Sequence, residues 1–550
     1  MPASLPNRPR FSIHGHPAAH DPMTYRILVT GALHPLALET WEAAPDVQVD
    51  YRPDLPYEEI LPIVGGYHAI VTRSETKVTR EMIDAGSRLK VIARAAVGIG
   101  NIDVDYATEK GILVINTPGK NTNSAAELTL GMLLAAMRKI VPAHRRMEEH
   151  GWDRHQFTGR ELAGKTIGII GLGNVGHRVA RFAHGFEMEV LAYDPYIADE
   201  AFERHHARKM ELDDLVAQAD VITVHVPLNG ETRNMIDAPH FARMKDGVVI
   251  LNVARGGVIA EPALLEALRA GKVSAAGIDT WSEEPPQGNP LIDLPNVVMT
   301  PHIGASTLEA QHRIAESISE QTLRALRDEV VDYPVNMPRV NVLTNPRVKF
   351  YTVLAEKLGS FAVQSLDFNP RRIQVVYRGE LNSEEGMMVR RAFLKGFLKN
   401  TTEEAITFVN AEQKAADRGI AINEVDDPAF SEYMSAVQFV VQDHEHSFKV
   451  AGVVFGENNY RLSQVNEFSF EVIPDGVLLW VINNDRPGVI GDIGGTLAEN
   501  GINISQFELS RNMPGGQAMS LLRVDTGIDN AVLEALRAIP NVVSVRRIAI

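Results

Sequence analysis

Cysteine is missing from the 550 residues of this chain, and long apolar runs and excess positive charge are missing too. A chain without cysteine has no disulfide, no thiolate zinc site and no cysteine nucleophile, and this composition fits a reducing cytoplasm. No run of eighteen apolar residues occurs, so the sequence predicts no membrane-spanning helix. The formal net charge of -16 disfavours nucleic acid or an anionic membrane as the partner. A small anionic substrate stays compatible with it, because a few arginines can form a local positive pocket.

The composition that remains is typical of a globular protein, with 45% hydrophobic and 23% charged residues. A chain of this length exceeds what one hydrophobic core supports, so we expect several domains. Residues 1–23 lack the apolar core of a signal peptide and are predicted to form a flexible tail. Metal binding by its histidines, His14, His16 and His20, is an alternative that we do not favour, and no metal site is predicted.

Short β-branched runs alternate with amphipathic stretches through the first 300 residues, which is typical of parallel sheets with helical crossovers. Four such runs before residue 118 predict a small flavodoxin-like lobe, formed by residues 24–120 and 304–332. Six more runs follow, and they predict a complete Rossmann sheet in residues 121–303. The fold class expected for this part is therefore α/β, with two lobes.

Helical periodicity predicts one long helix at "SAAELTLGMLLAAMRKIVPA", residues 124–143, and another at residues 306–330. Two prolines in "DYPVNMP" break the pattern and mark a boundary near residue 338. Residues 338–472 then mix helical and strand patterns, including the strand "RIQVVYRG" at 372–379, and predict an α+β domain.

The last segment, residues 476–550, reads as strand, helix, strand, strand, helix, strand. This order is typical of a ferredoxin-like βαββαβ unit. Four folded parts are thus expected after the tail.

The stretch "TIGIIGLGNVGHRVA" places glycines at Gly171, Gly173 and Gly176, between a predicted strand and a predicted helix. In a dinucleotide-binding loop the first glycine permits the tight turn, the second lets the backbone approach the pyrophosphate, and the third lets the helix pack on the strand. The amino terminus of the helix then faces the phosphates. A glycine-rich turn in an α/β domain without cofactor is the alternative.

The next predicted strand ends in Asp194, eighteen residues past Gly176. A carboxylate at this position accepts hydrogen bonds from a ribose 2′-hydroxyl and repels a 2′-phosphate. The sequence therefore favours NAD over NADP.

Three ionisable residues follow successive predicted strands: Arg255 in "NVARGG", Glu284 in "DTWSEEPP" and His302 in "MTPHIGAS". Ligands of open parallel sheets bind outside the carboxyl ends of the strands. Each residue alone has a structural explanation, as an interdomain ion pair, a solvated acid or a turn residue. Beside a dinucleotide site, the three together indicate a catalytic group.

These residue types supply what the oxidation of a 2-hydroxy acid requires. Arg255 would hold the substrate carboxylate through a bidentate pair, which lysine does not match in geometry. His302 would take the hydroxyl proton as hydride leaves C2. Glu284 would bind the other imidazole nitrogen, fix the tautomer and stabilise the imidazolium.

The motifs "GLGNVG", "NVARGG", "AGIDTWSEEPP" and "PHIGAST", in this order, resemble the D-2-hydroxyacid dehydrogenase family, and the similarity extends from about residue 24 to residue 550. The long form of this family carries an intervening domain and a terminal ACT domain, which "VAGVVFG" and "NNDRPGVIGDIGGTLAENGINIS" resemble. The resemblance implies NAD-dependent oxidation of 3-phosphoglycerate to 3-phosphohydroxypyruvate, the step that commits carbon to serine.

The resemblance also implies roles for individual positions. Asp279 would hold the nicotinamide amide, and Arg138 and Lys139 would add positive charge across a subunit interface. The remaining NAD contacts implied are Val97, Asn174, Val175, Val226, Ala254, His302, Ile303, Gly304 and Ala305. The implied substrate contacts in the first lobe are Arg73, Ser74, Arg94, Gly98 and Ile99.

For the ACT module, the resemblance implies binding of L-serine as an allosteric effector, with Asn483, Asp485 and Asn503 nearby, or a role in oligomer contacts alone. A homotetramer is expected, with a dimer formed through the nucleotide-binding lobes. Two alternatives stay open: a reductase for glyoxylate or hydroxypyruvate, and a nonenzymatic NAD-sensing corepressor. The extra domains disfavour the first, and the intact set of Arg255, Glu284 and His302 disfavours the second.

Overall fold

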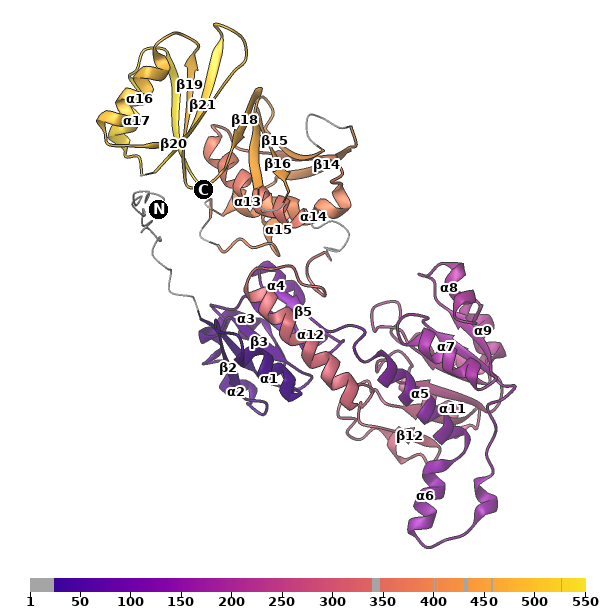
Figure 1. Cartoon of the computed structure of the whole chain (residues 1–550). Coiled ribbons are helices and arrows are strands. Elements are labelled where there is room, and N and C mark those ends of the chain that lie inside the picture. The colour runs from indigo at the N-terminus through magenta and orange to yellow at the C-terminus, as the bar shows by residue number, and fades with distance from the viewer. Residues whose placement is uncertain are drawn as a thin grey trace, which may run out of the picture. The chain divides into compact units, whose positions relative to one another are not determined.

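The structure, a computed structural model, describes residues 24–338, 347–399, 401–402, 404–429, 434–456, 459–525 and 527–550 (Figure 1). The predicted tail and its histidines lie outside these residues. The described residues form two compact units, the first made of residues 24–32, Leu38–Asn116 and the described residues from Ile318 onward, and the second of Leu33–Ala37 and Thr117–Ser317. The division falls within one long helix, α12 (Leu308–Leu326).

The first lobe contains a five-stranded parallel sheet in the order β2-β1-β3-β4-β5, which is the flavodoxin-like order. Its strands are β1 (Tyr25–Val29), β2 (Val47–Tyr51), β3 (Ala69–Thr72), β4 (Val91–Arg94) and β5 (Leu113–Ile115). Its helices are α1 (Pro35–Glu42), α2 (Tyr57–Ile60), η1 (Val64–Gly66), α3 (Arg80–Ala85) and α4 (Val104–Glu109). The four predicted strands are confirmed, and the half-exposed β2 was not predicted.

The segment that returns from α12 completes this lobe. The indole nitrogen of Trp41 donates to the carbonyl of Ser319 on α12 at 3.1 Å. Asn336 accepts from the amide of Val114 at 2.9 Å and donates to Ile112 O at 2.9 Å. These contacts join the segment after α12 to the sheet of the first lobe.

The second lobe contains a seven-stranded parallel sheet in the order β12-β11-β10-β9-β6-β7-β8. The order reverses beside β6, as in a doubly wound dinucleotide-binding fold. Its strands are β6 (Thr166–Ile170), β7 (Glu189–Tyr193), β8 (Arg208–Lys209), β9 (Val221–Val224), β10 (Val248–Asn252), β11 (Val273–Ile278) and β12 (Val297–Met299). All six predicted strands are confirmed, and only the two-residue β8 was not predicted.

Helices cover both faces of this sheet. One face packs α5 (Thr122–Met137), α7 (Gly176–Gly185) and α8 (Asp199–Arg204) in a single apolar cluster. The other packs α9 (Leu212–Gln218), α10 (Ala238–Arg243) and α11 (Glu261–Arg269), with η3 (Pro290–Asp293) at its edge. All residues of β9 and β10 are buried because both faces of the sheet are covered.

The predicted single helix over 124–143 is wrong. The helix α5 ends at Met137, and Lys139 takes a left-handed φ of 53° before α6 (Ile140–Glu148) begins. Periodicity continues through the break, so the pattern does not reveal it. The segment from α6 to η2 (Arg154–Phe157) stands apart from the lobe, and α6 has no buried residue.

The third part carries a six-stranded mixed sheet in the order β14-β13-β15-β16-β17-β18. Its strands are β13 (Arg372–Gly379), β14 (Ala421–Asp427), β15 (Ser435–Gln442), β16 (Ser447–Phe455), β17 (Asn459–Val465) and β18 (Phe468–Val472). Its helices are α13 (Val348–Ser365), α14 (Ser383–Leu398) and α15 (Ala411–Asp417). The predicted strand at 372–379 is confirmed.

The last part is the predicted βαββαβ unit, with its antiparallel sheet in the order β20-β21-β19-β22. Its elements are β19 (Val477–Asn484), α16 (Val489–Glu499), β20 (Ile504–Arg511), β21 (Gln517–Val524), α17 (Asn530–Arg537) and β22 (Val542–Ala549). One face of the sheet packs on α16 and α17.

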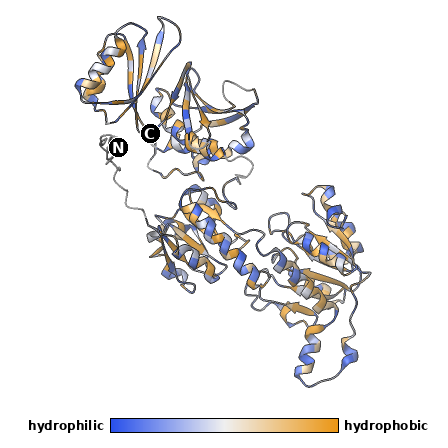
Figure 2. Ribbon diagram, in the orientation of Figure 1, coloured by the Kyte–Doolittle hydropathy of each residue, from blue (hydrophilic) through white to orange (hydrophobic). Residues whose placement is uncertain are grey.

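The other face of this sheet shares a core with the third part. Leu478, Trp480 and Leu521 belong to the same apolar cluster as residues of α13 and α14. The rings of Trp480 and Phe361 stack with centroids 6.0 Å apart. Hydropathy follows this pattern, with apolar residues on the strands and on the inner faces of the helices (Figure 2). Among the described residues, no helix has the length and apolarity to cross a bilayer.

Candidate active site

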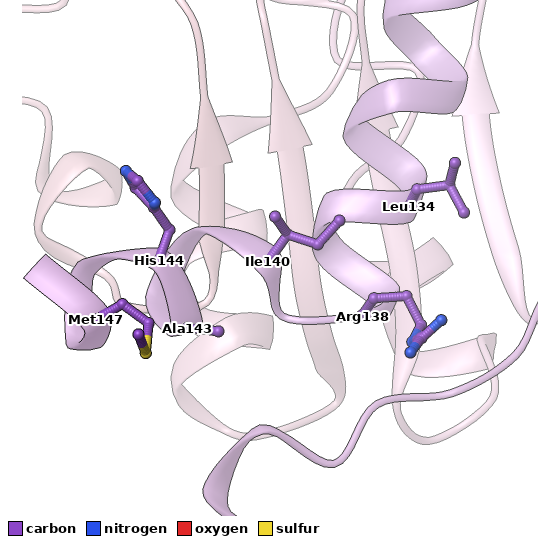
Figure 3. A pocket seen from close by; sticks show the side chains of 6 residues that line it. All are labelled: Leu134, Arg138, Ile140, Ala143, His144 and Met147. Atoms are coloured by element: carbon purple, nitrogen blue, oxygen red, sulfur yellow. The ribbon is translucent and has the colours of Figure 1, made fainter. Parts of the chain in front are cut away.

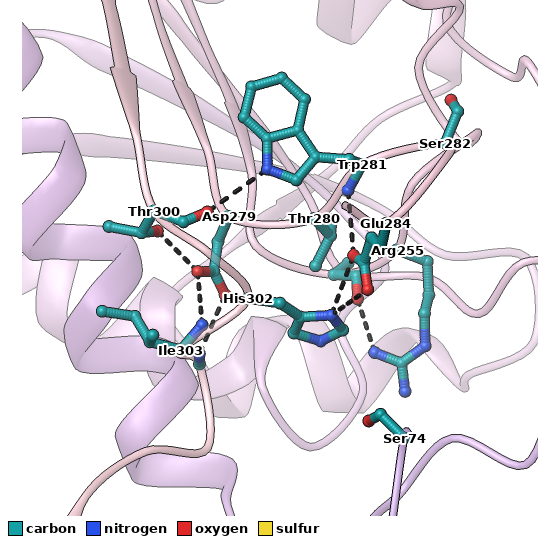
Figure 4. A network of polar contacts seen from close by, with 12 residues as sticks. Ser74, Arg255, Asp279, Thr280, Trp281, Ser282, Glu284, Thr300, His302 and Ile303 are labelled. Atoms are coloured by element: carbon teal, nitrogen blue, oxygen red, sulfur yellow. Dashed lines mark hydrogen bonds and ion pairs between the residues drawn. The ribbon is translucent and has the colours of Figure 1, made fainter. Parts of the chain in front are cut away.

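The three residues that the sequence singled out follow neighbouring strands of the second lobe. Arg255 lies three residues past the end of β10, Glu284 six past β11, and His302 three past β12. Since β10, β11 and β12 are parallel neighbours, their carboxyl ends meet at one edge of the sheet. Figure 4 shows the three side chains grouped at this edge.

His302 and Glu284 form a hydrogen-bonded pair. The Nδ1 of His302 lies 2.9 Å from each carboxylate oxygen of Glu284 (Figure 4). The side chains are 41% and 40% exposed, so a ligand can reach the imidazole. Burial alone would raise the pKa of Glu284, but the hydrogen bond from His302, its charge and the Trp281 amide lower that pKa below its ordinary value. The carboxylate therefore stays ionised beside the imidazole.

Arg255 is held by its own loop and keeps part of its guanidinium available. Its Nη1 donates to the carbonyl of Ala254 at 2.6 Å, and its own carbonyl accepts from Nδ2 of Asn252 at 2.9 Å. Burial lowers the pKa of Arg255, and the charge of Glu284 opposes that shift. A guanidinium that is desolvated in this way binds a carboxylate more strongly than one in water.

Gly256 explains the glycine that follows Arg255. A Cβ at this position would lie 1.8 Å from the carbonyl oxygen of Trp281. The loop after β10 can therefore contact the loop that carries Glu284 only because residue 256 has no side chain.

The glycine-rich loop has the geometry that a dinucleotide needs. Gly171 has a φ of 91°, and a Cβ on Gly176 would lie 1.9 Å from Gly171 O, so the third glycine lets α7 approach the loop. A Cβ on Gly173 would meet nothing within 4 Å, which leaves open space above the second glycine. This open position at the start of α7 fits a pyrophosphate.

Asp194 lies directly after β7, next to this loop. Its Oδ2 accepts from the amide of Leu172 at 2.9 Å, and its Oδ1 accepts from the amide of Tyr196 at 3.0 Å. Each carboxylate oxygen has a second lone pair, so the fixed side chain can still accept a ribose hydroxyl. The position fits NAD.

Asp279 is fully buried, and its carboxylate is engaged inside the protein. It accepts from the hydroxyl of Thr300 at 2.6 Å, from the amide of Ile303 at 2.7 Å and from the amide of Gly304 at 2.9 Å (Figure 4). If Asp279 also holds the nicotinamide amide, as expected from the sequence, its carboxylate accepts that hydrogen bond in addition to these three.

The other implied NAD positions of this lobe lie in the same loops. Val226 packs against the turn at Gly171, where a Cβ would come within 2.7 Å of it. Ile303 is 38% exposed. Asn174 is exposed at the start of the α7 region, Val175 precedes α7, Ala254 precedes Arg255, and Ala305 accepts from Gln311 at 2.8 Å.

The first lobe brings together part of the predicted substrate group. Buried Arg94 donates through Nε to Gly98 O at 2.9 Å and through Nη2 to the hydroxyl of Ser74 at 3.3 Å. The Nη1 of Arg73 donates to the carbonyl of Ala32 at 3.0 Å. The next two positions of this region, Val97 and Ile99, flank Gly98, and Val97 O accepts from Asn116 at 2.8 Å.

The predicted effector residues of the last part do not form one cluster. Asn483 and Asp485 lie at the end of β19, where Asp485 accepts from Arg511 at the end of β20. Asn503 precedes β20 and donates to Asp525 at 2.6 Å, at the opposite end of the sheet. The antiparallel register separates them, which a reading of the strand order alone did not reveal.

Three residues that support the site were not predicted. Asn252 holds the Arg255 loop, Thr300 binds Asp279, and Trp281 donates its amide to Glu284 at 3.2 Å and its indole N–H to Thr300 O at 3.3 Å. A signal was present for two of them, because Asn252 and Thr300 are polar residues that end the apolar runs "VVILN" and "VVMT".

Comparison with known families agrees with this geometry. Residues 130–304 match the D-isomer specific 2-hydroxyacid dehydrogenase, NAD binding domain. Residues 347–466 match the D-3-phosphoglycerate dehydrogenase intervening domain, and residues 478–541 match the ACT domain. The second lobe is thus the NAD-binding domain of a D-2-hydroxyacid dehydrogenase, the class that the sequence predicted.

Known proteins that align over most of the chain assign it to a narrower family. D-3-phosphoglycerate dehydrogenase of Methanocaldococcus jannaschii is 41% identical over 94% of this chain and 98% of its own length. The Bacillus subtilis enzyme of the same name is 36% identical over 88% of this chain and 92% of its own. The chain belongs to the D-3-phosphoglycerate dehydrogenase family.

Solved structures resemble more than half of the chain. The TT0316 protein from Thermus thermophilus is 34% identical, with a TM-score of 0.52, over 56% of this chain and 99% of its own. D-lactate dehydrogenase from Aquifex aeolicus, complexed with NAD and lactic acid, is 28% identical, with a TM-score of 0.51, over 57% of this chain and 99% of its own. NAD is the cofactor that these similarities support.

Proposed function

We propose that this chain oxidises 3-phosphoglycerate to 3-phosphohydroxypyruvate with NAD, the first step from that metabolite towards serine. The observation that carries the proposal is the His302–Glu284 pair at 2.9 Å, beside Arg255 and at the strand ends of a dinucleotide-binding sheet. A relative named D-3-phosphoglycerate dehydrogenase, 41% identical over 94% of the chain, supports the substrate.

The proposed mechanism assigns one task to each side chain. Bound NAD supplies the acceptor for the hydride that leaves C2 of the substrate. Arg255 holds the substrate carboxylate with the N–H groups that do not bind Ala254. Because Nδ1 of His302 is bound to Glu284, its Nε2 takes the hydroxyl proton, and the ionised carboxylate stabilises the resulting imidazolium.

The cofactor is held by loops of the second lobe in this proposal. The amides at the start of α7 bind the pyrophosphate and Asp194 binds the adenosine ribose. Asn174, Val175, Val226, Ala254 and the segment 302–305 line the rest of the site.

The substrate phosphate and carboxylate are assigned to the first lobe as well. Arg94 and Ser74 are the groups that the structure brings together there, and the amides of Gly98 and Ile99 offer donors for a carboxylate. Arg73, whose Nη1 donates to Ala32 O at 3.0 Å, stays in the proposal as a substrate contact.

We also propose a homo-oligomer whose subunits meet through the second lobe. The α6 segment supports this, because Ile140 and Met147 are each 52% exposed and Trp152 is 75% exposed. A hollow of about 490 Å³ beside α6 is lined by Leu134, Arg138, Ile140, Ala143, His144 and Met147 (Figure 3). Apolar surface of this kind is typical of a protein interface. A tetramer, a cytoplasmic location and the domain limits given by the sequence belong to the proposal.

L-serine is proposed as an effector of the ACT domain. Since Asn503 lies at the far end of the sheet from Asn483 and Asp485, these three residues line one pocket only if two copies of the domain contribute. A titration of activity with L-serine tests this, and an unchanged rate would contradict it.

The substrate assignment is tested by comparing 3-phosphohydroxypyruvate, glyoxylate and pyruvate as acceptors for NADH. We expect kcat/KM to be highest for 3-phosphohydroxypyruvate by at least about 100-fold, because loss of charge-assisted phosphate contacts costs several kcal/mol. A preference for glyoxylate would support the alternative reductase. No oxidation of NADH with any acceptor would support the corepressor.

A further inference from the structure

His302 adopts a backbone conformation that is unfavourable for a residue with a side chain. Its φ is 53°, in the left-handed region that residues other than glycine rarely occupy. Such a conformation persists only where surrounding contacts determine it. The structure must therefore contain groups that hold the turn of residues 300–304.

Asp279 supplies those contacts. Its main-chain carbonyl accepts from the amide of His302 at 2.9 Å, and its carboxylate accepts from Ile303 and Gly304 at 2.7 and 2.9 Å. The amides of His302 and Ile303, on either side of the His302 carbonyl, thus both donate to Asp279. Every residue of the turn from His302 to Gly304 is bound to Asp279.

Thr300 fixes the carboxylate in turn. Its hydroxyl donates to Oδ1 of Asp279 at 2.6 Å, the same oxygen that accepts from Ile303. The carboxylate is fully buried, and its three hydrogen bonds within the described part of the chain come from a hydroxyl and two amides, none of them charged. A buried carboxylate without a counter-ion depends on neutral donors, so the loss of one donor shifts its position.

We propose that Asp279 and Thr300 are positioning residues that set the orientation of the His302 imidazole, in addition to any contact that Asp279 makes with NAD. The inference rests on the proposed function, in which His302 carries the proton. The pair links the end of β11 to the end of β12, the two strands after which Glu284 and His302 follow. It therefore keeps the imidazole aligned with Glu284 on one side and the substrate on the other.

The test uses Thr300, which has no assigned contact with substrate or cofactor. Thr300→Val removes the hydroxyl and keeps the shape of the side chain, whereas Thr300→Ser keeps a hydroxyl and removes the methyl group. In the full-length protein we expect Thr300→Val to lower kcat for 3-phosphohydroxypyruvate reduction by about 10- to 100-fold, as a misplaced catalytic group does. NADH affinity, measured by fluorescence, and KM should stay within about twofold, and Thr300→Ser should recover most of kcat.

Thr322→Val is the matched control, because it removes a buried hydroxyl that donates to Ile318 O at 2.7 Å in α12. Its kcat should equal that of the wild type. If Thr300→Val does not fold, Thr300→Ala is measured instead, since it lacks the hydroxyl without placing a methyl group against the carboxylate.

A hydroxyl-free variant with wild-type kcat would overturn the proposal. So would a variant that loses NADH affinity while keeping kcat at saturating NADH, because Asp279 would then serve the cofactor alone. Wild-type protein that binds NADH but reduces no 2-keto acid would instead refute the proposed function, which keeps the two failures distinct.

Discussion

Arg255 shows how a single residue reveals the site. A guanidinium directly after a run of buried apolar residues is costly unless a ligand or a partner compensates it. Here the compensation is partial, since Nη1 binds Ala254 O and the charge of Glu284 opposes the effect of burial on the pKa. The remaining donors are directed to a carboxylate in the proposed mechanism.

The three proposed catalytic residues could be found from sequence because each is an ionisable group after an apolar run, at a place where parallel sheets bind ligands. Asn252 and Thr300 also end apolar runs, but this signal is weak, because a polar residue at a strand end is also an ordinary turn residue. Their partners depend on backbone amides and carbonyls whose directions the sequence pattern does not specify.

Asp194 carries the first prediction at this scale. Asp194→Ala should weaken NAD binding by about 1 to 3 kcal/mol, since a charge-assisted hydrogen bond to the ribose is lost. Binding of NADP should improve relative to NAD, because the repulsion of the 2′-phosphate disappears. Fluorescence titration with NADH and NADPH measures both affinities. An unchanged ratio of the two would contradict the ribose assignment.

His225 carries a second prediction, on pH. Burial lowers the pKa of His225 to about 3, from an ordinary value of 6.5. Between these values the unfolded chain binds the proton more readily, so stability falls as the pH falls through this range, by about 2 kcal/mol at pH 5. His225→Gln removes this dependence. Unfolding in urea at pH 7.5 and pH 5 should show the variant losing less stability than the wild type, and equal losses would contradict the burial of a neutral imidazole.

At the scale of elements, parallel strands were predicted well and helix ends poorly. Strands β6, β9 and β10 are buried on both faces, and β7, β11 and β12 are largely apolar, so each reads as a compact apolar run. The half-exposed β2 and the two-residue β8 carry no such run. The break between α5 and α6 was missed because it depends on the left-handed backbone of Lys139, a residue with no turn signature.

Two glycines of the α7 loop give matched variants. Gly176→Ala places a Cβ 1.9 Å from Gly171 O and should separate α7 from the loop, with a large loss of thermal stability. Gly173→Ala meets nothing within 4 Å and should fold normally. Its methyl group would occupy the space assigned to the pyrophosphate, so NADH affinity should fall by at least about tenfold. Normal NADH binding by Gly173→Ala would show that the pyrophosphate lies elsewhere.

At the scale of the whole molecule, the structure contains four sheets, one for each of the four parts that the sequence predicts. The sequence did not predict that the last two parts share a hydrophobic core. Leu478, Trp480, Met519, Leu521 and Ile548 of the ACT domain lie in one core with α13 and α14. Apolar residues that alternate along a strand indicate two faces, yet they do not say which neighbour covers the second face.

This shared core predicts the effect of truncation. A chain that ends at residue 475 loses five buried side chains from that core, each worth about 1.5 to 3 kcal/mol. It should bind an apolar dye and unfold at a lower temperature than the full-length protein. A chain that ends at residue 338 loses both parts together and should not expose this core. Equal dye binding by the two truncated chains would contradict the shared core.

The central claim is that His302, held by Glu284, carries the proton in an NAD-dependent oxidation. The most direct measurement compares wild type and His302→Ala for reduction of 3-phosphohydroxypyruvate by NADH, with NADH affinity measured in parallel. We predict that kcat falls by about 10²- to 10⁴-fold while NADH affinity is unchanged. A variant that turns over as fast as the wild type would contradict the account.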